Sequence, residues 1–243
     1  MDFTRFDTTK LYNEFIVSTP YNHLVIDNFL SQEYVESLLK EVKEYDSIYF
    51  PNTCDNSINQ EQDNVVQSKK KGVSDYNLFG PLGKSFIDIS KSPEMLQFLE
   101  KITGINDLES DPHLYGGGIH RTTTGGRLAI HADFNIHPLT GKHRRINVLL
   151  YLNPDWKPEY NGEFELWETN MSKCDKKIAP IMNRLVLFRI RDDAYHGHPE
   201  IWQGPVEVPR YSFALYYYTN DRPEEEKNAP HMALWRQRYD GEF

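Results

Sequence analysis

Apolar positions in the first hundred residues change from a strand pattern to two helical patterns. The run HLVID, residues 23–27, predicts a short β-strand. Apolar residues then recur at helical spacing between 34 and 42, behind Ser31, a residue type that caps helices. The run SPEMLQFLEKITG, residues 92–104, predicts a second helix, because a Ser-Pro start and a glycine end are typical helix boundaries.

A polar stretch follows the first predicted helix. Residues 51–76 are rich in Asn, Gln, Asp, Ser and Lys, which predicts a long surface loop. Such a loop either covers a site as a lid or is an ordinary surface segment, and the sequence leaves both interpretations open. We interpret the basic run Lys69 to Lys71 as part of this solvated loop, and the acidic run PEEE after Asn220 as a solvated cap.

From about residue 112 onward, short runs rich in Ile, Val, Leu, Tyr and Phe are separated by Gly, Pro and Asn clusters. This pattern is typical of an antiparallel sandwich or barrel. Along 145–153 and 210–217, every second residue is apolar and the opposite face is mixed. We expect the apolar faces to pack against the N-terminal helices. The mixed faces look either to solvent or into a polar cavity, and alternation alone does not choose between the two.

Composition narrows the class of protein. A chain of 243 residues without an internal repeat or a low-complexity linker is expected to form one domain, 1–243. A net charge of −9 argues against a nucleic-acid partner, and the longest apolar run, VLLYL at 148–152, is too short to span a membrane. The two cysteines, Cys54 and Cys174, show no metal-binding spacing, and no signal peptide is recognisable, so we expect a reducing, cytoplasmic location.

His131 and Asp133 form a candidate metal clamp. Both are odd-numbered residues of the segment 127–135, so regular alternation places them on one strand face, opposite the even-numbered apolar residues such as Leu128. A lone HxD is weak evidence, because a non-haem iron site needs two imidazoles and one carboxylate on one face of the metal. His196, which follows the apolar run 184–190, is the candidate third ligand.

Two further histidines precede prolines and compete with these ligands. His137 is interpreted as a strand-end residue, and His198 as a turn residue. Downstream, Arg210 and Ser212 share a strand face, and an Arg with a hydroxyl on one face can hold a carboxylate. A dicarboxylate co-substrate would need such a pair.

The ordered series HxD, H and RxS resembles the Fe(II)/2-oxoglutarate-dependent dioxygenases. Several longer segments are similar to the prolyl 4-hydroxylase catalytic-domain branch of that superfamily, over roughly residues 22–220: VIDNFLSQEYVESLLKEV, GGRLAIHADFNIHP, RRINVLLYLNPDW, NGEFELWE, NRLVLFRI, YHGHPE and RYSFALYYYT. The resemblance implies a mostly β fold with flanking helices (α+β), a double-stranded β-helix or jelly roll. In it, residues 1–110 form supporting structure, 111–220 the jelly-roll core and 221–243 a tail.

The resemblance also implies the roles of individual residues. It implies an Fe(II) site formed by His131, Asp133 and His196. It implies a 2-oxoglutarate site formed by Arg210, Tyr151 and, less directly, Ser212. The segment between His196 and Arg210 is longer than is usual in the family, so His198 stays open as an alternative third ligand.

The activity implied by the resemblance is hydroxylation of an unactivated C–H bond with O2, releasing succinate and CO2, with ascorbate as an accessory reductant. The substrate is expected to be a peptidyl proline or a small molecule, and His120 and Arg121 are candidates for the substrate side of the site. Two alternatives remain open at this point. One is a non-catalytic jelly-roll binding module, and the other is a cupin-type metalloenzyme that does not use 2-oxoglutarate.

Overall fold

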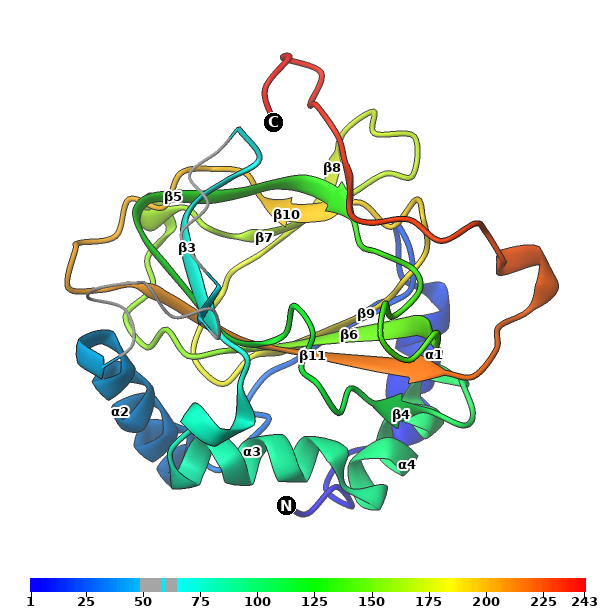
Figure 1. Ribbon diagram of the computed structural model, residues 1–243, viewed down its shortest axis with the longest axis horizontal. Coiled ribbons are helices and arrows are strands. Elements are labelled where there is room, and N and C mark those ends of the chain that lie inside the picture. The colour runs from blue at the N-terminus through cyan, green and yellow to red at the C-terminus, as the bar shows by residue number, and fades with distance from the viewer. Residues whose placement is uncertain (49–57, 60–64) are drawn as a thin grey trace.

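Strands dominate the fold. The computed structural model describes residues 1–48, 58–59 and 65–243 (Figure 1). The longer strands have these bounds: β1 His23–Ile26, β3 Gln67–Val73, β5 Gly118–Ala132, β6 His143–Tyr151, β7 Phe164–Trp167, β8 Cys174–Ile178, β9 Leu185–Arg189, β10 His196–His198 and β11 Arg210–Thr219. The shorter strands are β2 Ile58–Asn59, β4 Glu109–Ser110 and β12 Leu234–Trp235.

The strands pair antiparallel in the order β1-β9-β6-β11-β5-β10-β7-β8. They wrap into two facing layers, one with β9, β6 and β11 and the other with β10, β7 and β8, and the long strand β5 pairs with both (Figure 1). This arrangement confirms the prediction of a mostly β, jelly-roll fold with flanking helices. Every described helix is too short or too polar to cross a lipid bilayer.

Four helices among the described residues support one side of this sheet: α1 Thr8–Val17, α2 Gln32–Ile48, α3 Pro81–Lys91 and α4 Pro93–Thr103. α2, α3 and α4 lie beneath the layer of β9, β6 and β11 (Figure 1). α2 and α4 confirm the two predicted helices, and the Ser92 hydroxyl accepts a hydrogen bond from the Met95 amide as an N-cap. Gly104 ends α4 with φ of 70°, a backbone conformation that favours glycine. α1 and α3 were not predicted from the sequence.

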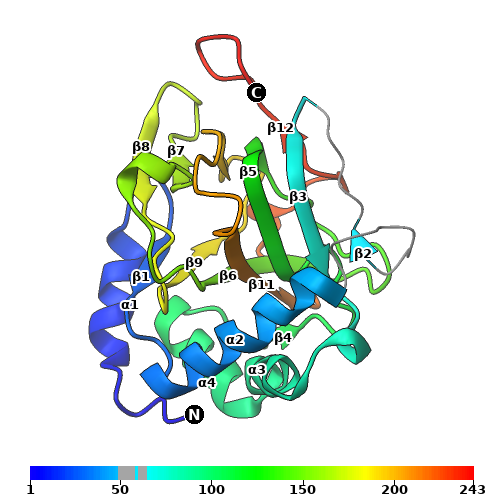
Figure 2. The same cartoon turned by 90° about the vertical axis from the view of Figure 1, so that its left-hand side faces the viewer.

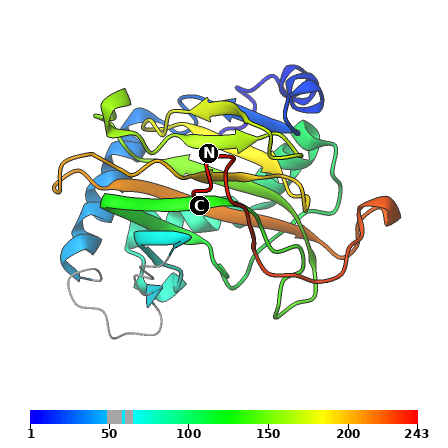
Figure 3. The same cartoon turned by 90° about the horizontal axis from the view of Figure 1, so that it is seen from above.

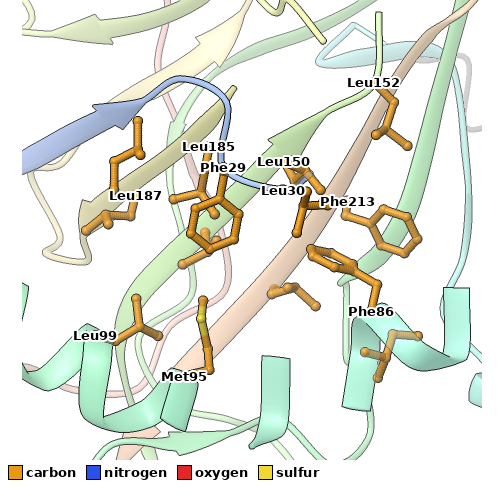
Figure 4. Packing of buried hydrophobic residues seen from close by; sticks show 14 of the residues in the cluster. Phe29, Leu30, Phe86, Met95, Leu99, Leu150, Leu152, Leu185, Leu187 and Phe213 are labelled. Carbon is orange, nitrogen blue, oxygen red and sulfur yellow. The ribbon is translucent and has the colours of Figure 1, made fainter. Parts of the chain in front are cut away.

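The core lies between these helices and the apolar strand faces (Figure 4). Residues Ile146, Val148, Leu150 and Leu152 are all buried in it, as the alternation predicted. Phe213 of β11 packs against Phe86 of α3, with ring centroids 4.9 Å apart. The mixed faces therefore point the other way, between the two strand layers.

The predicted loop 51–76 is partly wrong. Residues 67–73 form β3, which pairs with β5 (Figure 2). The segment escaped recognition because its side chains are polar on both faces: Lys70 lines a cavity, while Lys71 is on the opposite face. Lys70, the central residue of the KKK run, therefore lies in a strand and lines the cavity, so its interpretation as part of a solvated loop is wrong. Residues 49–57 and 60–64 lie outside the described residues. The hypothesis that the loop forms a lid therefore stays a prediction for these residues.

The regular alternation predicted for β5 is also wrong at one point. His196 of β10 lies opposite His131, whereas His198 lies opposite Leu128, so four residues of β5 lie opposite three residues of β10. This β-bulge turns Leu128 and His131 to the same side, although one number is even and the other odd.

The C-terminal tail is more ordered than predicted. Glu226, the last residue of the 3₁₀ turn Glu224–Glu226, forms ion pairs with Arg145, Arg189 and Arg222, so the PEEE run is only partly solvated. Further along, β12 pairs with β5, and Figure 3 shows the tail returning along that strand. The tail thereby closes one side of the space between the layers.

Candidate metal centre and active site

A cavity of about 200 Å³ lies between the two strand layers. Its wall is formed by the mixed faces of β5, β6, β10 and β11, together with residues of β3 and the C-terminal tail. The polar and aromatic residues that line this cavity include His120, His131, Asp133, Arg144, Asn147, Tyr151, His196, His198, Arg210, Ser212, Tyr216, Lys70 and Trp235. The odd-numbered face of β6 and the even-numbered face of β11 thus face a polar cavity.

Antiparallel pairing of β5 and β10 brings His131, Asp133 and His196 together. One ligand atom from each of these side chains lies within 4.8 Å of the other two. The Nε2 atom of His131 is 3.5 Å from Asp133 Oδ1, and that of His196 is 3.3 Å from Asp133 Oδ2. Gly197 permits this approach, since a Cβ there would lie 2.7 Å from the Ala129 carbonyl oxygen of β5.

The backbone orients both imidazoles toward this centre. His131 Nδ1 lies 2.9 Å from the Ala129 carbonyl oxygen, and His196 Nδ1 lies 2.8 Å from that of Ala194. An Nδ1–H that donates to these carbonyls leaves each Nε2 with a free lone pair directed at the third side chain. Two such imidazoles and one carboxylate match the donor set that holds non-haem Fe(II), with the remaining coordination positions open.

Arg144 and Asn147 of β6 hold the Asp133 carboxylate. The Asn147 amide donates to Asp133 Oδ2 at 2.6 Å, and an Arg144 guanidinium nitrogen lies 3.2 Å from the same oxygen. Burial alone would raise the pKa of Asp133, but the charge of Arg144 is the main influence that holds that pKa well below its ordinary value. The carboxylate therefore stays ionised and ready to bind a cation.

Arg144 was not among the predicted site residues, because the alternating strand pattern starts at residue 145 in the sequence. Only the pairing partners of β6 show that Arg144 points inward, where it stacks on Tyr216 with its guanidinium carbon 3.5 Å from the ring centroid. A β-bulge accompanies this change of alternation at the start of β6: Tyr217 of β11 lies opposite Ile146 and Tyr218 lies opposite Arg144, so Arg145 is an extra residue in β6.

Arg210 lies in the same cavity as the metal centre. Its guanidinium carbon is 5.0 Å from the centroid of the Tyr151 ring, and its Nε donates to the Gly162 carbonyl. The buried Tyr151 hydroxyl has no hydrogen-bond partner among the described residues, and Ser212 pairs with Tyr151 across β11 and β6. A guanidinium and an unpartnered hydroxyl that share one cavity wall fit the carboxylate of 2-oxoglutarate.

The structure separates the remaining histidine candidates. His198 lines the cavity but is not part of the three-residue group, so the geometry favours His196 as the third ligand. His137 lies 3.1 Å from Asp111 and accepts from the amides of residues 139 and 140, which agrees with a structural role. His120 lines the cavity as expected. Arg121 does not, since it is on the opposite face and forms an ion pair with Asp46 at 2.7 Å.

Four lining residues of the cavity, Gln67, Lys70, Ala233 and Trp235, come from outside the predicted core 111–220, and two of them lie close to the site. Trp235 of β12 lies against His131 with ring centroids 4.7 Å apart, and Lys70 comes from β3. Neither had a recognisable sequence signal, because a short tail strand and a polar strand both resemble surface segments.

Comparison with known proteins agrees with this geometry. The family model of the 2OG-Fe(II) oxygenase superfamily matches residues 117–218, which include the His131, Asp133 and His196 group. The matched oxygenase segment also contains Arg210 and Tyr151, so the resemblance stated from the sequence is confirmed.

The chain is also similar to individual hydroxylases. It is 26% identical over 210 residues to prolyl 3-hydroxylase OGFOD1 of Mus musculus, an alignment that covers 82% of this chain and 33% of that protein. The chain thus spans about a third of that relative's length.

Solved structures show the shared fold. A Pseudomonas putida prolyl-4-hydroxylase superposes with a TM-score of 0.58 at 15% identity, covering 86% of this chain and 98% of that one. A Trichoplax adhaerens prolyl hydroxylase in complex with a hypoxia inducible factor peptide superposes with a TM-score of 0.59 at 20% identity, covering 87% and 90%.

Proposed function

We propose that this chain is an Fe(II)- and 2-oxoglutarate-dependent dioxygenase that hydroxylates an unactivated C–H bond. One observation carries the proposal: the group of His131, Asp133 and His196 faces the same cavity as Arg210 and the unpartnered Tyr151 hydroxyl. A metal-binding group alone fits many enzymes, and an arginine alone fits many anion sites. Their combination in one cavity fits a metal that works together with a dicarboxylate.

The residues divide the work between them. His131, Asp133 and His196 hold the iron ion through two imidazoles and one carboxylate. Arg210 and Tyr151, with Ser212 beside them, hold the distal carboxylate of 2-oxoglutarate. Iron and 2-oxoglutarate, when bound, supply the oxidising chemistry with O2 and leave succinate and CO2 as products.

The cavity wall protects and positions this centre. Phe188 and Phe164 flank the His196 ring with centroids 4.5 and 5.5 Å away, and Trp235 covers His131 from the tail. These apolar rings exclude water from the ligands, which strengthens the electrostatic interactions of the site. Arg144 and Asn147 fix the orientation of Asp133 before any metal binds.

For the substrate we propose a prolyl residue of a peptide, with a small molecule as the alternative. The support is the similarity to a mouse protein named prolyl 3-hydroxylase and the fold shared with prolyl hydroxylases. We keep the single domain 1–243, the cytoplasmic location and ascorbate as predictions.

The test uses the full chain under nitrogen. Addition of Fe(II) and then 2-oxoglutarate is expected to produce the visible absorption band of a metal-chelated 2-oxoacid, and admission of air is expected to yield succinate. A protein that binds neither Fe(II) nor 2-oxoglutarate would be the non-catalytic binding module. A protein that binds Fe(II) without any band or succinate would be the cupin-type alternative. Either result contradicts the proposal.

A further inference from the structure

A second polar group lines the cavity beside the metal centre. It consists of Lys70, His120 and His198, and Arg210 adjoins it. The strand register places Arg210 of β11 opposite Thr122 of β5, and Thr122 opposite Lys70 of β3. Arg210 and Lys70 therefore occupy one row across three strands, about 10 Å apart at the backbone, with Thr122 between them.

His198 faces this row from β10 and lacks a partner. Only 3% of its surface is exposed, and neither ring nitrogen has a hydrogen-bond partner among the described residues. Buried polar groups are nearly always hydrogen-bonded, and the exceptions mark a missing ligand, ion or water. The unpaired imidazole thus indicates that something polar occupies this end of the cavity during function.

Lys70 has no ion-pair partner among the carboxylates of the described residues, although the charge of Asp133 across the cavity acts on it. Burial and the charge of Arg210 lower the pKa of Lys70 to about 8, so most of the lysine is still charged at neutral pH. Lys70 and Arg210 concentrate positive potential in this part of the cavity, and burial together with their charges lowers the pKa of the adjacent His120.

A charge inventory of the cavity shows what is missing. Among the described lining residues, the cations Lys70, Arg144 and Arg210 face Asp133 as the single carboxylate. Fe(II) and the 2-oxoglutarate dianion cancel each other, so their binding leaves this excess of positive charge unchanged. Arg144 forms an ion pair with Asp133. Arg210 is assigned to 2-oxoglutarate, and the negative charge of Glu163 has only a weak effect on Arg210. Lys70 is partly buried and has no ion-pair partner among the described residues, and a partly desolvated, unpaired charge is unfavourable.

We propose that Lys70 and His198 bind a carboxylate group of the hydroxylated substrate, so that this enzyme acts on an acidic substrate. The inference rests on the proposed function, because it assigns Arg210 to 2-oxoglutarate. The carboxylate comes either from an acidic side chain of a peptide or from a small carboxylic acid, and both sources present the same chemistry to Lys70.

Acetate serves as the minimal probe, and acetamide as its neutral counterpart. The protein is loaded with Zn(II), which has no redox chemistry, and with 2-oxoglutarate, and binding is followed by backbone amide shifts of β3 and β5. We expect saturable acetate binding that weakens about tenfold in Lys70→Met and is retained in Lys70→Arg, in line with loss of one charge-assisted hydrogen bond. Lys71→Met, on the opposite strand face, is the matched control and is expected to bind like wild type. Acetamide is expected not to bind.

Two results would overturn the inference. The first is acetate binding that is absent in wild type or equal in wild type and Lys70→Met. The second is a loss of 2-oxoglutarate affinity in Lys70→Met as large as in Arg210→Ala, which would assign Lys70 to the co-substrate. Failure of the wild-type protein to bind 2-oxoglutarate would instead refute the proposed function. Acetate binding to the Zn(II)-loaded protein without 2-oxoglutarate would then still test the role of Lys70.

Matched competitors identify the source of the carboxylate. Displacement of acetate by an acetylated Pro-Glu peptide, but not by its Pro-Gln counterpart, supports an acidic peptide. Displacement by N-acetylproline, but not by its amide, supports a small acid. Equal displacement by both members of both pairs contradicts recognition of a carboxylate.

Discussion

Replacement of Asn147 by leucine tests how the metal-binding carboxylate is held. The Asn147 side chain is buried and donates to Asp133 Oδ2 at 2.6 Å, and its amide oxygen accepts from Arg144 Nε at 2.9 Å. Leucine has a similar volume but provides neither contact. Asn147→Leu therefore removes the donor from Asp133 and leaves Arg144 with an unpaired nitrogen, while the packing of β6 is largely preserved.

The size of the effect follows from these contacts. A hydrogen bond to a buried charged group contributes about 1.5 to 3 kcal/mol. Removal of a partner that orients a metal ligand costs about 10- to 100-fold in metal affinity. These two estimates agree, since about 1.4 kcal/mol corresponds to a factor of ten. We therefore expect the Fe(II) dissociation constant of Asn147→Leu to rise by about 10- to 100-fold.

The assay is competition for Fe(II) against a chromophoric chelator under nitrogen, with the melting temperature of each variant as the check on folding. Asn106 is exposed, and Asn106→Leu is the control that is expected to bind Fe(II) like wild type. Wild-type affinity in a folded Asn147→Leu protein would show that the hydrogen bond to Asp133 does not prepare the metal centre, and the reasoning would be refuted.

Three further predictions concern the co-substrate, pH and the core. Arg210→Ala is expected to raise the 2-oxoglutarate concentration needed for half-maximal turnover at least tenfold, consistent with loss of a charged hydrogen bond of about 1.5 to 3 kcal/mol; unchanged co-substrate dependence would show that the carboxylate is bound elsewhere. Burial lowers the pKa of His120 well below its ordinary value, so the unfolded chain takes up a proton near pH 6.5 that the folded chain does not. Stability is therefore fully present above pH 6.5 and falls below it by at most about 1.4 kcal/mol per pH unit for this residue. Urea titrations from pH 7 to 5 are expected to show a shallower loss for His120→Gln than for wild type or the exposed-site control His113→Gln, and identical slopes would contradict this assignment. Phe213→Ala is expected to lower the free energy of unfolding by about 3 to 5 kcal/mol, since Phe213 is fully buried against Phe86; a loss below about 1 kcal/mol in urea would show that the core collapses around the gap.

Regular strands were predictable in detail. Along 146–152 and 210–217 the period of two assigned apolar residues such as Val148 and Phe213 to the core, and polar residues such as Arg210 to the other face, whereas Arg145 lies at the β-bulge and does not line the cavity. Alternation succeeds there because these segments have no irregular pairing between the residues concerned. The order of HxD, H and RxS then indicated which side chains share the cavity.

Irregular pairing and distant segments were not predictable. The bulge that turns Leu128 and His131 to one side exists only in the pairing with β10, and nothing in the local sequence indicates it. Lys70 was hidden because strand β3 is polar on both faces, and pattern analysis assigns such segments to loops. Trp235 belongs to a two-residue strand, which is too short to show a period.

The central claim is that the metal centre and Arg210 act together to couple O2 to 2-oxoglutarate. The most direct test measures CO2 released from carboxyl-labelled 2-oxoglutarate, together with succinate, when air is admitted to Fe(II)-loaded protein. The account predicts CO2 and succinate in equal amounts from wild type and neither from Asp133→Ala. Release of both products at the same rate by a folded Asp133→Ala protein, or their absence from Fe(II)-loaded wild type, would contradict it.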